Sequence, residues 1–240
     1  MRHTSEVYLF LLFAFIAMAF LILTMLLVPA RTIMIPLDNK LMVSASFIAS
    51  CCVGMSLAVY PGWFRKRLTA HNIARNRKNG PSTRAFSGHH PDCERFQAHR
   101  LTIGAKTWCA GCLGLLLGSL VSIFFMMLYV ISSPGFSRNM YELLLLLGLI
   151  LVVVVFLETV LQNRHPIAHV ALNAILILGF FFVTMSVTEL TGKGLFGVFT
   201  VVLCALWLNT RVTLSTWRHQ RTCSSCTASC KMYEASSASR

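Results

Sequence analysis

Apolar residues in this chain come in long uninterrupted blocks, not at the alternating spacing of a half-buried strand or the three-to-four spacing of an amphipathic helix. A block of about 18 or more apolar residues can cross the hydrocarbon core of a bilayer, which is about 30 Å thick. Because a backbone in lipid must satisfy its own hydrogen bonds, each block predicts a transmembrane helix. We therefore predict an all-α, polytopic transmembrane helical bundle. Its expected spans are Val7–Pro29, Leu41–Tyr60, Gly111–Ser132, Tyr141–Gln162, Ala168–Glu189 and Leu195–Trp217.

These spans divide the chain into four regions. Residues 1–60 hold the first two transmembrane helices, and residues 61–110 form a long basic loop with a Cys/His motif. Residues 111–217 hold a four-helix transmembrane region, and residues 218–240 form a tail rich in Cys and Ser. Pro, Gly and Ser mark the breaks between spans.

The first span has two interpretations. Val28 and Ala30 resemble the small residues that precede a signal-peptidase site. The apolar block, however, is about twice as long as a usual signal-peptide core, and the segment before it has few positive charges. We therefore favour an uncleaved membrane anchor.

The composition agrees with a membrane protein. Of the 240 residues, 56% are hydrophobic and 12% are charged, whereas a soluble domain carries about 25% charged residues. A soluble enzyme is excluded on this basis. The net charge of +13 fits loops that face anionic lipid headgroups, so we expect no nucleic-acid partner.

Lys and Arg are unevenly distributed between the loops. The segment between spans two and three and the tail after span six are rich in them. The loops on the opposite side carry only Arg31, Lys40, Arg138 and Lys193. The positive-inside rule therefore places the long loop and both termini in the cytosol, in a multi-pass protein of the cell membrane.

The first part of the long loop, Trp63–Lys78, is cationic and contains no carboxylate. Trp63 and Phe64 suit the aromatic belt at a membrane surface. We expect this segment to lie against anionic lipid headgroups. We favour a role as a topology determinant over regulated binding of anionic lipid.

The second half of the loop carries a metal-type spacing, H-x2-C-x15-C-x2-C. Its residues are His90, Cys93, Cys109 and Cys112. This is the four-ligand zinc template with His in the first place. Ligands in such a pair converge on one ion from a tight turn, and two pairs complete a tetrahedron. Cytosolic thiols stay reduced, which favours a metal over a disulfide. We predict a zinc site, with His89 and His99 as alternative ligands.

Two other interpretations of the cysteines stay open. Cys109 and Cys112 lie at the N-terminus of the predicted span three, and a helix N-terminus favours the thiolate, so the two can form a redox pair. They can also be small packing residues, because the sequence from Gly114 to Gly118 lets another helix approach closely. Packing does not account for the His-His-Pro-Asp-Cys half of the motif.

Three pieces of this segment carry a resemblance: His90-Pro91, Arg95-Phe96 and Cys109-Ala110-Gly111-Cys112-Leu113-Gly114 with Gly118. From Gly88 to Leu120 the chain resembles a family of small predicted multi-pass membrane proteins of archaea and bacteria, a domain of unknown function. Many members carry Arg between the two cysteines, where this chain has Gly111. The family lends no established activity. The resemblance implies a multi-pass membrane protein of prokaryotic origin.

Ionisable residues also gather near the cytosolic ends of spans four and five. Glu158 lies about one turn from the end of span four, and His165, His169 and Asn173 fall on one helical face. We favour helix capping and contact with the membrane surface for these groups. The alternative is a vestibule beside the metal site, with Glu158 as the acid–base group and the histidines as ligands or proton carriers. The candidate catalytic residues are Glu158, Glu94, His165 and His169.

The tail carries a third group of cysteines, Cys223, Cys226 and Cys230. They can bind a metal, with His219 as a fourth ligand, help to hold an iron–sulfur cluster, or accept a palmitoyl group. The missing fourth cysteine and the Ser-rich surroundings make this a weak signal.

Three functions follow from these features. The first is a structural or regulatory membrane protein in which zinc organises the loop and presents a surface to a membrane-protein partner or a second copy. The second is a metal-dependent or thiol-redox enzyme at the cytosolic face. The third is a transporter. A closed four-ligand site favours the first, and the plain aliphatic centres of the spans count against the third.

Overall fold

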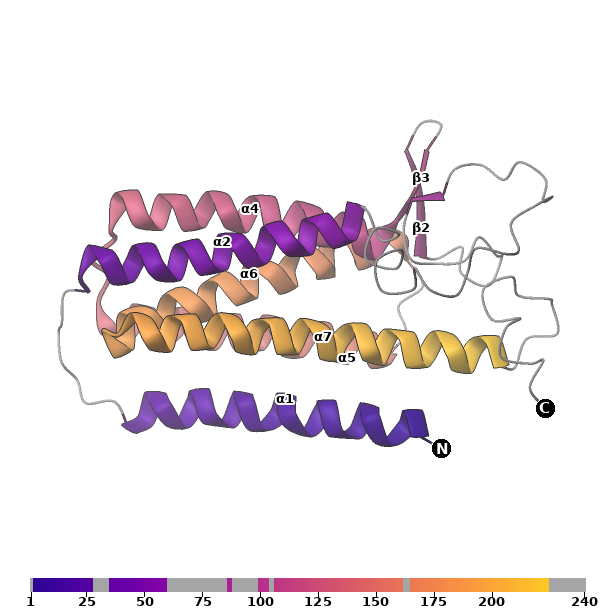
Figure 1. The fold of residues 1–240 in the computed structure, drawn as a ribbon, viewed down its shortest axis with the longest axis horizontal. Helices are drawn as coiled ribbons and strands as arrows, with labels where there is room; N and C mark the ends of the chain where they lie inside the picture. Colours follow the sequence, from indigo (N-terminus) through magenta and orange to yellow (C-terminus); the bar gives the residue numbers. More distant parts are fainter. Residues whose placement is uncertain are drawn as a thin grey trace, which may run out of the picture.

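A computed structural model describes residues 2–27, 35–59, 86–87, 99–103, 106–161 and 165–224 of the chain. This part contains six helices that lie side by side along one direction (Figure 1). They are α1 (Arg2–Leu27), α2 (Leu37–Val59), α4 (Ala110–Ser132), α5 (Arg138–Leu161), α6 (Pro166–Thr191) and α7 (Gly194–Ser224). The predicted fold class, an all-α polytopic bundle, is confirmed.

Five of these helices, α2, α4, α5, α6 and α7 as far as His219, are long and apolar enough to cross a membrane. The chain is therefore a multi-pass membrane protein. The first helix contains a shorter apolar stretch, Val7–Leu23. The last helix continues to Ser224, beyond the predicted end of the span at Trp217, because no Pro or Gly follows Trp217 to end it.

The centre of the bundle is α6. Inside the bundle, 61% of its span is buried, against 28–39% for the other four spans. It packs closely against α4 and α5 because glycines face its backbone. A Cβ on Gly118 would lie 2.6 Å from Cα of Ala174, and a Cβ on Gly148 would lie 2.8 Å from the carbonyl oxygen of Gly179. The predicted close approach of a helix to Gly114 and Gly118 is confirmed.

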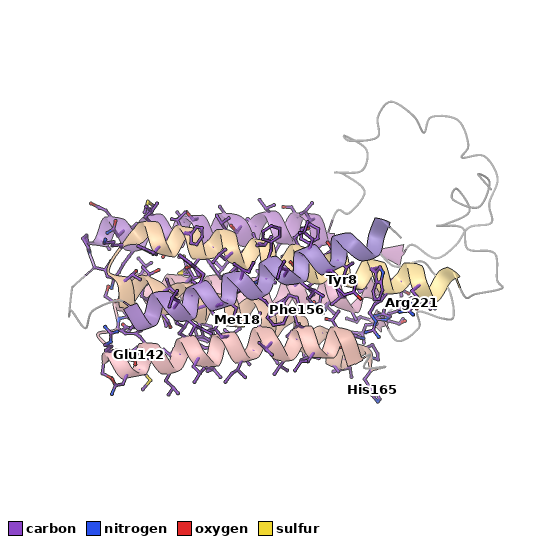
Figure 2. All side chains as sticks on the ribbon, turned by 90° about the horizontal axis from the view of Figure 1, so that it is seen from below. Tyr8, Met18, Glu142, Phe156, His165 and Arg221 are labelled. Carbon is purple, nitrogen blue, oxygen red and sulfur yellow. The ribbon has the colours of Figure 1, made fainter. Side chains whose placement is uncertain are left out.

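The first helix packs on the outside of α6 and α7. It buries one stripe, Val7, Ala14, Ala17 and Leu21, at heptad-like spacing. The indole Nε1 of Trp207 donates a hydrogen bond of 3.1 Å to the carbonyl oxygen of Ala14. Apolar side chains elsewhere on the helices point outward along the whole length of the bundle (Figure 2), as expected for a surface in lipid.

The two ends of the bundle differ (Figure 1). At the end from which the strands project, here called the hairpin end, α1, α4 and α6 begin, and α2, α5 and α7 end. The other end, here called the far end, carries the turns from α4 to α5 and from α6 to α7. The two ends of the described chain therefore lie on the same side as the long loop.

Three short strands stand at the hairpin end, namely β1 (Phe86–Ser87), β2 (Arg100–Ile103) and β3 (Lys106–Cys109). Their order is β1-β3-β2, with β1 parallel and β2 antiparallel to β3. The sequence analysis did not predict this hairpin. The last residue of β3 directly precedes α4, so the hairpin is joined to a membrane helix without a linker.

Candidate functional site

The Cys pair lies where the long loop re-enters the bundle. Cys109 is the last residue of β3 and the N-cap of α4, and Cys112 lies in the first turn of α4. Both side chains are buried, with exposed fractions of 2% and 9%, and they pack with Ala58 near the end of α2. The loop leaves the bundle just after Ala58 and returns at Cys109. The two ends of the loop therefore meet at the cysteines.

The rest of the predicted metal site lies outside the described residues. This applies to His89, His90, Cys93 and Glu94, and also to the lipid-facing segment Trp63–Lys78 and to Cys226 and Cys230. Among the described residues, no group of three or more His, Cys, Asp or Glu side chains is placed to hold a metal ion. The zinc site and the alternative tail site stay predictions.

Two of the candidate catalytic residues lie together at the hairpin end. Oε1 of Glu158 on α5 is 3.0 Å from Nδ1 of His169 on α6. The side chains are only 9% and 11% exposed. The atoms are within ion-pair distance, although the carboxylate is not oriented for a hydrogen bond. His165 is exposed at the start of α6, so the structure brings together Glu158 and His169 and leaves His165 outside.

Two histidines that the sequence analysis considered for metal sites lie beside His169 instead. The ring of His99, which precedes β2, stacks on the ring of His169 with a centroid distance of 4.5 Å. The ring of His219 on α7 meets His99 edge-on at 5.4 Å. The three imidazoles thus connect the hairpin, α6 and α7. The sequence could not predict these ring contacts, because the three histidines belong to different elements and helical spacing relates only residues of one helix.

Asn173 and Arg211 complete the polar surroundings of the pair. Asn173 is fully buried one turn beyond His169 and donates a hydrogen bond from Nδ2 to the carbonyl oxygen of His169. The charge of Arg211 on α7 interacts with Glu158 and with Cys109. A Cβ on Gly111 would lie 3.9 Å from both Nδ2 of Asn173 and Sγ of Cys109. The cysteine and the acid–base pair therefore belong to one region.

We call this region the hairpin-end cluster, defined as Cys109, Glu158, His169, Asn173 and Arg211. Several of its buried polar atoms have no hydrogen-bond partner among the described residues. They are Oε1 and Oε2 of Glu158, Nε2 of His169, Oδ1 of Asn173 and Nε of Arg211. Because buried polar atoms are normally paired, such a concentration indicates a place where water or a ligand supplies the missing partners.

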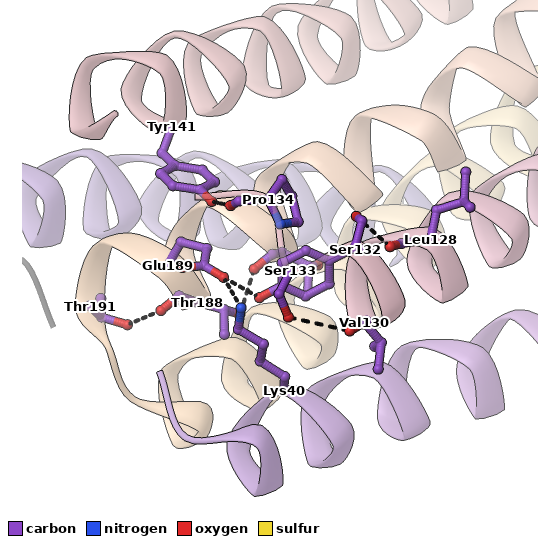
Figure 3. A network of polar contacts seen from close by, with 12 residues as sticks. Lys40, Leu128, Val130, Ser132, Ser133, Pro134, Tyr141, Thr188, Glu189 and Thr191 are labelled. Carbon is purple, nitrogen blue, oxygen red and sulfur yellow. Dashed lines mark hydrogen bonds and ion pairs between the residues drawn. The ribbon is translucent and has the colours of Figure 1, made fainter. Parts of the chain in front are cut away.

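A second polar network lies at the far end, and the sequence analysis missed it. Nζ of Lys40 is 3.1 Å from Oε1 of Glu189, and the hydroxyl of Tyr129 donates a 2.7 Å hydrogen bond to the same oxygen (Figure 3). Nζ of Lys40 also lies 5.2 Å from the centre of the Tyr129 ring. Next to this network, Tyr141 donates a hydrogen bond to the carbonyl oxygen of Pro134 (Figure 3). These contacts tie α2, α4 and α6 together.

The two networks differ in what they can do. At the far end, the charge of Lys40 is balanced by Glu189, which also accepts the Tyr129 hydrogen bond, as in a structural clamp. At the hairpin end, donors and acceptors remain unpaired beside an acid–base pair. The hairpin-end cluster is therefore the candidate functional site.

A comparison of the chain with protein-family models, curated proteins and solved structures found no match. The functional assignment depends on the contacts described above.

Proposed function

We propose that the chain is a multi-pass membrane protein whose cytosolic face is organised by a zinc site. Its ligands are His90, Cys93, Cys109 and Cys112. The metal holds the loop of residues 61–110 against the bundle, and the role of the site is structural or regulatory. The same segment carries the resemblance to small prokaryotic membrane proteins.

One observation carries this proposal. Cys109 and Cys112 are buried with Ala58, at the point where the loop both leaves and re-enters the bundle. A metal that is bound by these two cysteines and by two more ligands from the loop would close the loop at its base. Closed four-ligand zinc sites stabilise small loops in this way, because the binding free energy of the metal adds to that of folding.

The cytosolic orientation follows from the charges. The end of α2 and the start of α4, between which the basic loop runs, lie on the same side of the bundle as the basic end of α7 (Figure 1). Excess Lys and Arg favour the cytosolic side of the membrane. Thiols are kept reduced on that side, and reduced thiols are what a zinc site requires.

Elemental analysis of the detergent-purified protein tests this proposal. We expect about one zinc per chain in the wild type, since one four-ligand site is proposed. Cys109→Ser and Cys112→Ser should lose the metal. Cys52→Ser is the matched control, because Cys52 is an exposed cysteine of α2 away from the loop. A metal-free wild type, purified without chelators, would contradict the proposal.

A second candidate is a membrane enzyme at the same face. The observation that favours it is the position of Cys109, which is the N-cap of α4, makes no side-chain capping hydrogen bond and lies in one cluster with Glu158 and His169. A thiol at a helix N-terminus beside an acid–base pair can act in thiol–disulfide exchange, with Cys112 as the second thiol.

Mass spectrometry of acid-quenched cells separates the two candidates. Reduced, zinc-protected Cys109 and Cys112 are expected for the structural site. A Cys109–Cys112 disulfide in a substantial share of the protein, together with absence of zinc, would favour the redox enzyme instead.

A further inference from the structure

We propose that the part of the hairpin-end cluster on α5, α6 and α7, namely Glu158, His169, Asn173 and Arg211, binds a phosphate monoester together with Arg218. The guanidinium groups of Arg211 and Arg218 are its principal ligands. This site is distinct from the zinc site and uses residues of α5, α6 and α7. The ligand comes either from the headgroup of an anionic lipid of phosphatidic-acid type or from a soluble phosphate.

Arg211 lies in an environment that favours a bound anion. Its Nε atom is buried and has no hydrogen-bond partner in the described part of the chain. Its charge interacts with Glu158, which is also within ion-pair distance of His169. A buried guanidinium N–H without an acceptor is costly, so an anion that accepts from it is favoured.

Two guanidiniums reach the same turn of α5. Nη1 of Arg218 donates a hydrogen bond to the carbonyl oxygen of Thr159 at the end of α5, and Arg211 interacts with the adjacent Glu158. Arg211 and Arg218 are two helical turns apart and lie on the same face of α7. The planar guanidinium fork matches the oxygens of a phosphate, and two such forks can hold one phosphate group between them.

The charges of α7 and its neighbours at the hairpin end also favour an anion. From Gly194 to Ser224, α7 contains no Asp or Glu. Arg211 interacts with Glu158, and Arg218 bonds to the adjacent Thr159, so two guanidiniums and one carboxylate meet at this turn of α5. The sum of these three charges is positive whatever the state of the histidines. The N-termini of α4 and α6 add to the positive potential at this end.

The acceptors beside the guanidiniums favour a phosphate monoester over other anions. Beside the guanidiniums, the cluster presents unpaired acceptors, namely both carboxylate oxygens of Glu158 and Oδ1 of Asn173. A phosphate that keeps one P–OH group donates a hydrogen bond to such an acceptor while its other oxygens accept from Arg211 and Arg218. A fully ionised anion without a hydrogen to donate would leave these acceptors unpaired.

Binding is measured on the full-length protein with two probes. Inorganic phosphate is titrated into protein in uncharged detergent at constant ionic strength, and thermal unfolding reports the apparent affinity. In parallel, the protein is placed in phosphatidylcholine bilayer discs with or without phosphatidic acid, and native mass spectrometry counts retained lipid. Stabilisation by both probes, or by phosphate alone, identifies a soluble phosphate as a ligand. Stabilisation and retention with phosphatidic acid alone identify the lipid headgroup.

Two variants and a control make the test specific. Arg211→Lys keeps the charge and removes the fork, and Arg218→Gln removes the second ligand at a half-buried position. Each should weaken the apparent affinity for the responding probe about tenfold, the scale of one lost charge-assisted contact. Arg138→Lys is the matched control, because Arg138 pairs with Glu142 at the far end, and its affinity should equal that of the wild type.

The proposal is overturned if neither probe stabilises the wild type, or if Arg211→Lys and Arg218→Gln respond as the wild type does. The zinc content of each variant is measured on the same samples. It should equal that of the wild type, so loss of phosphate binding and loss of the zinc site are distinguishable.

Discussion

Two ionisable residues buried inside the bundle depend on each other for charge balance. Lys40 and Glu189 form an ion pair with side chains only 10% and 11% exposed, and Tyr129 holds the carboxylate in place. Removal of one partner leaves a poorly solvated charge behind, which is far more destabilising than the loss of the attraction alone. The far-end network is therefore a sensitive place to test the packing of α2, α4 and α6.

We predict that Glu189→Gln lowers the free energy of unfolding by about 3 kcal/mol, because Lys40 loses its counter-charge. Denaturant unfolding of the purified protein, followed by circular dichroism, measures this value. The matched control is Glu142→Gln, whose pair with Arg138 is largely exposed and should change stability by no more than about 0.5 kcal/mol. Equal effects of the two substitutions would show that the Lys40–Glu189 pair is not buried.

At the hairpin end, the sequence singled out Glu158 and His169 as candidates, because carboxylates and imidazoles at membrane depth are rarely without a role. The structure brings these two side chains together, and their catalytic role stays a prediction. It could not show that His99 and His219 lie beside His169, since these residues belong to different elements. It also grouped His165 with His169 from helical spacing, whereas α6 begins at Pro166 and His165 is left exposed. Glu158 and His169 flank the short connection between α5 and α6, so their proximity could be predicted, whereas contacts between elements far apart in the sequence could not.

The helices are positioned by glycine contacts as much as by apolar side chains. The backbone of α6 approaches α4 at Gly118 and α5 at Gly148 so closely that no Cβ fits. Such small-residue contacts drive helix association in lipid, where apolar side chains gain little by leaving the hydrocarbon.

We predict that Gly118→Ala lowers the free energy of unfolding by about 1–3 kcal/mol, because its Cβ would lie 2.6 Å from the backbone of Ala174 and force α4 and α6 apart. Unfolding in mild detergent measures the change. In contrast, Gly54→Ala on α2 should leave stability unchanged or raise it by up to about 1 kcal/mol, because nothing lies within 4 Å of its Cβ position and Ala favours a helix. A loss at Gly54 as large as that at Gly118 would contradict this account.

Helix positions were predicted from the sequence because apolar blocks determine them almost alone. The β-hairpin was not, although Leu101 to Trp108 contains Thr, Ile and Trp, residues that favour strands. The hairpin is short, and β1 pairs with β3 from more than a dozen residues away. Long-range pairing of a two-residue strand leaves no periodic signal in the sequence.

At the scale of the whole molecule, α1 is joined to the bundle by few contacts. Trp207 provides a polar one through its hydrogen bond to Ala14, in the middle of the membrane-spanning region. In lipid, an indole N–H without a partner is unfavourable, so this bond favours a docked α1.

We predict that Trp207→Phe loosens α1 and lowers the free energy of unfolding by about 1 kcal/mol, the net value of a typical hydrogen bond. Limited proteolysis of the protein in bilayer discs, with cleavage near the start of α1 as the readout, should be faster in this variant. Trp217→Phe is the control, since Trp217 lies at the hairpin end of α7, where its ring contacts Arg221 and not Ala14. Unchanged proteolysis in Trp207→Phe would show that other contacts are sufficient to hold α1.

The length of α7 has a consequence for everything attached to its end. With 31 residues it is about 46 Å long, about 16 Å more than the hydrocarbon thickness. The helix therefore extends through the headgroup layer, and the hydrogen bond from Arg218 to the end of α5 holds it in position there. The end of α7 at Ser224 is thereby held at a fixed height above the lipid. A protein that binds this end of the helix would therefore lie at a constant distance from the bilayer.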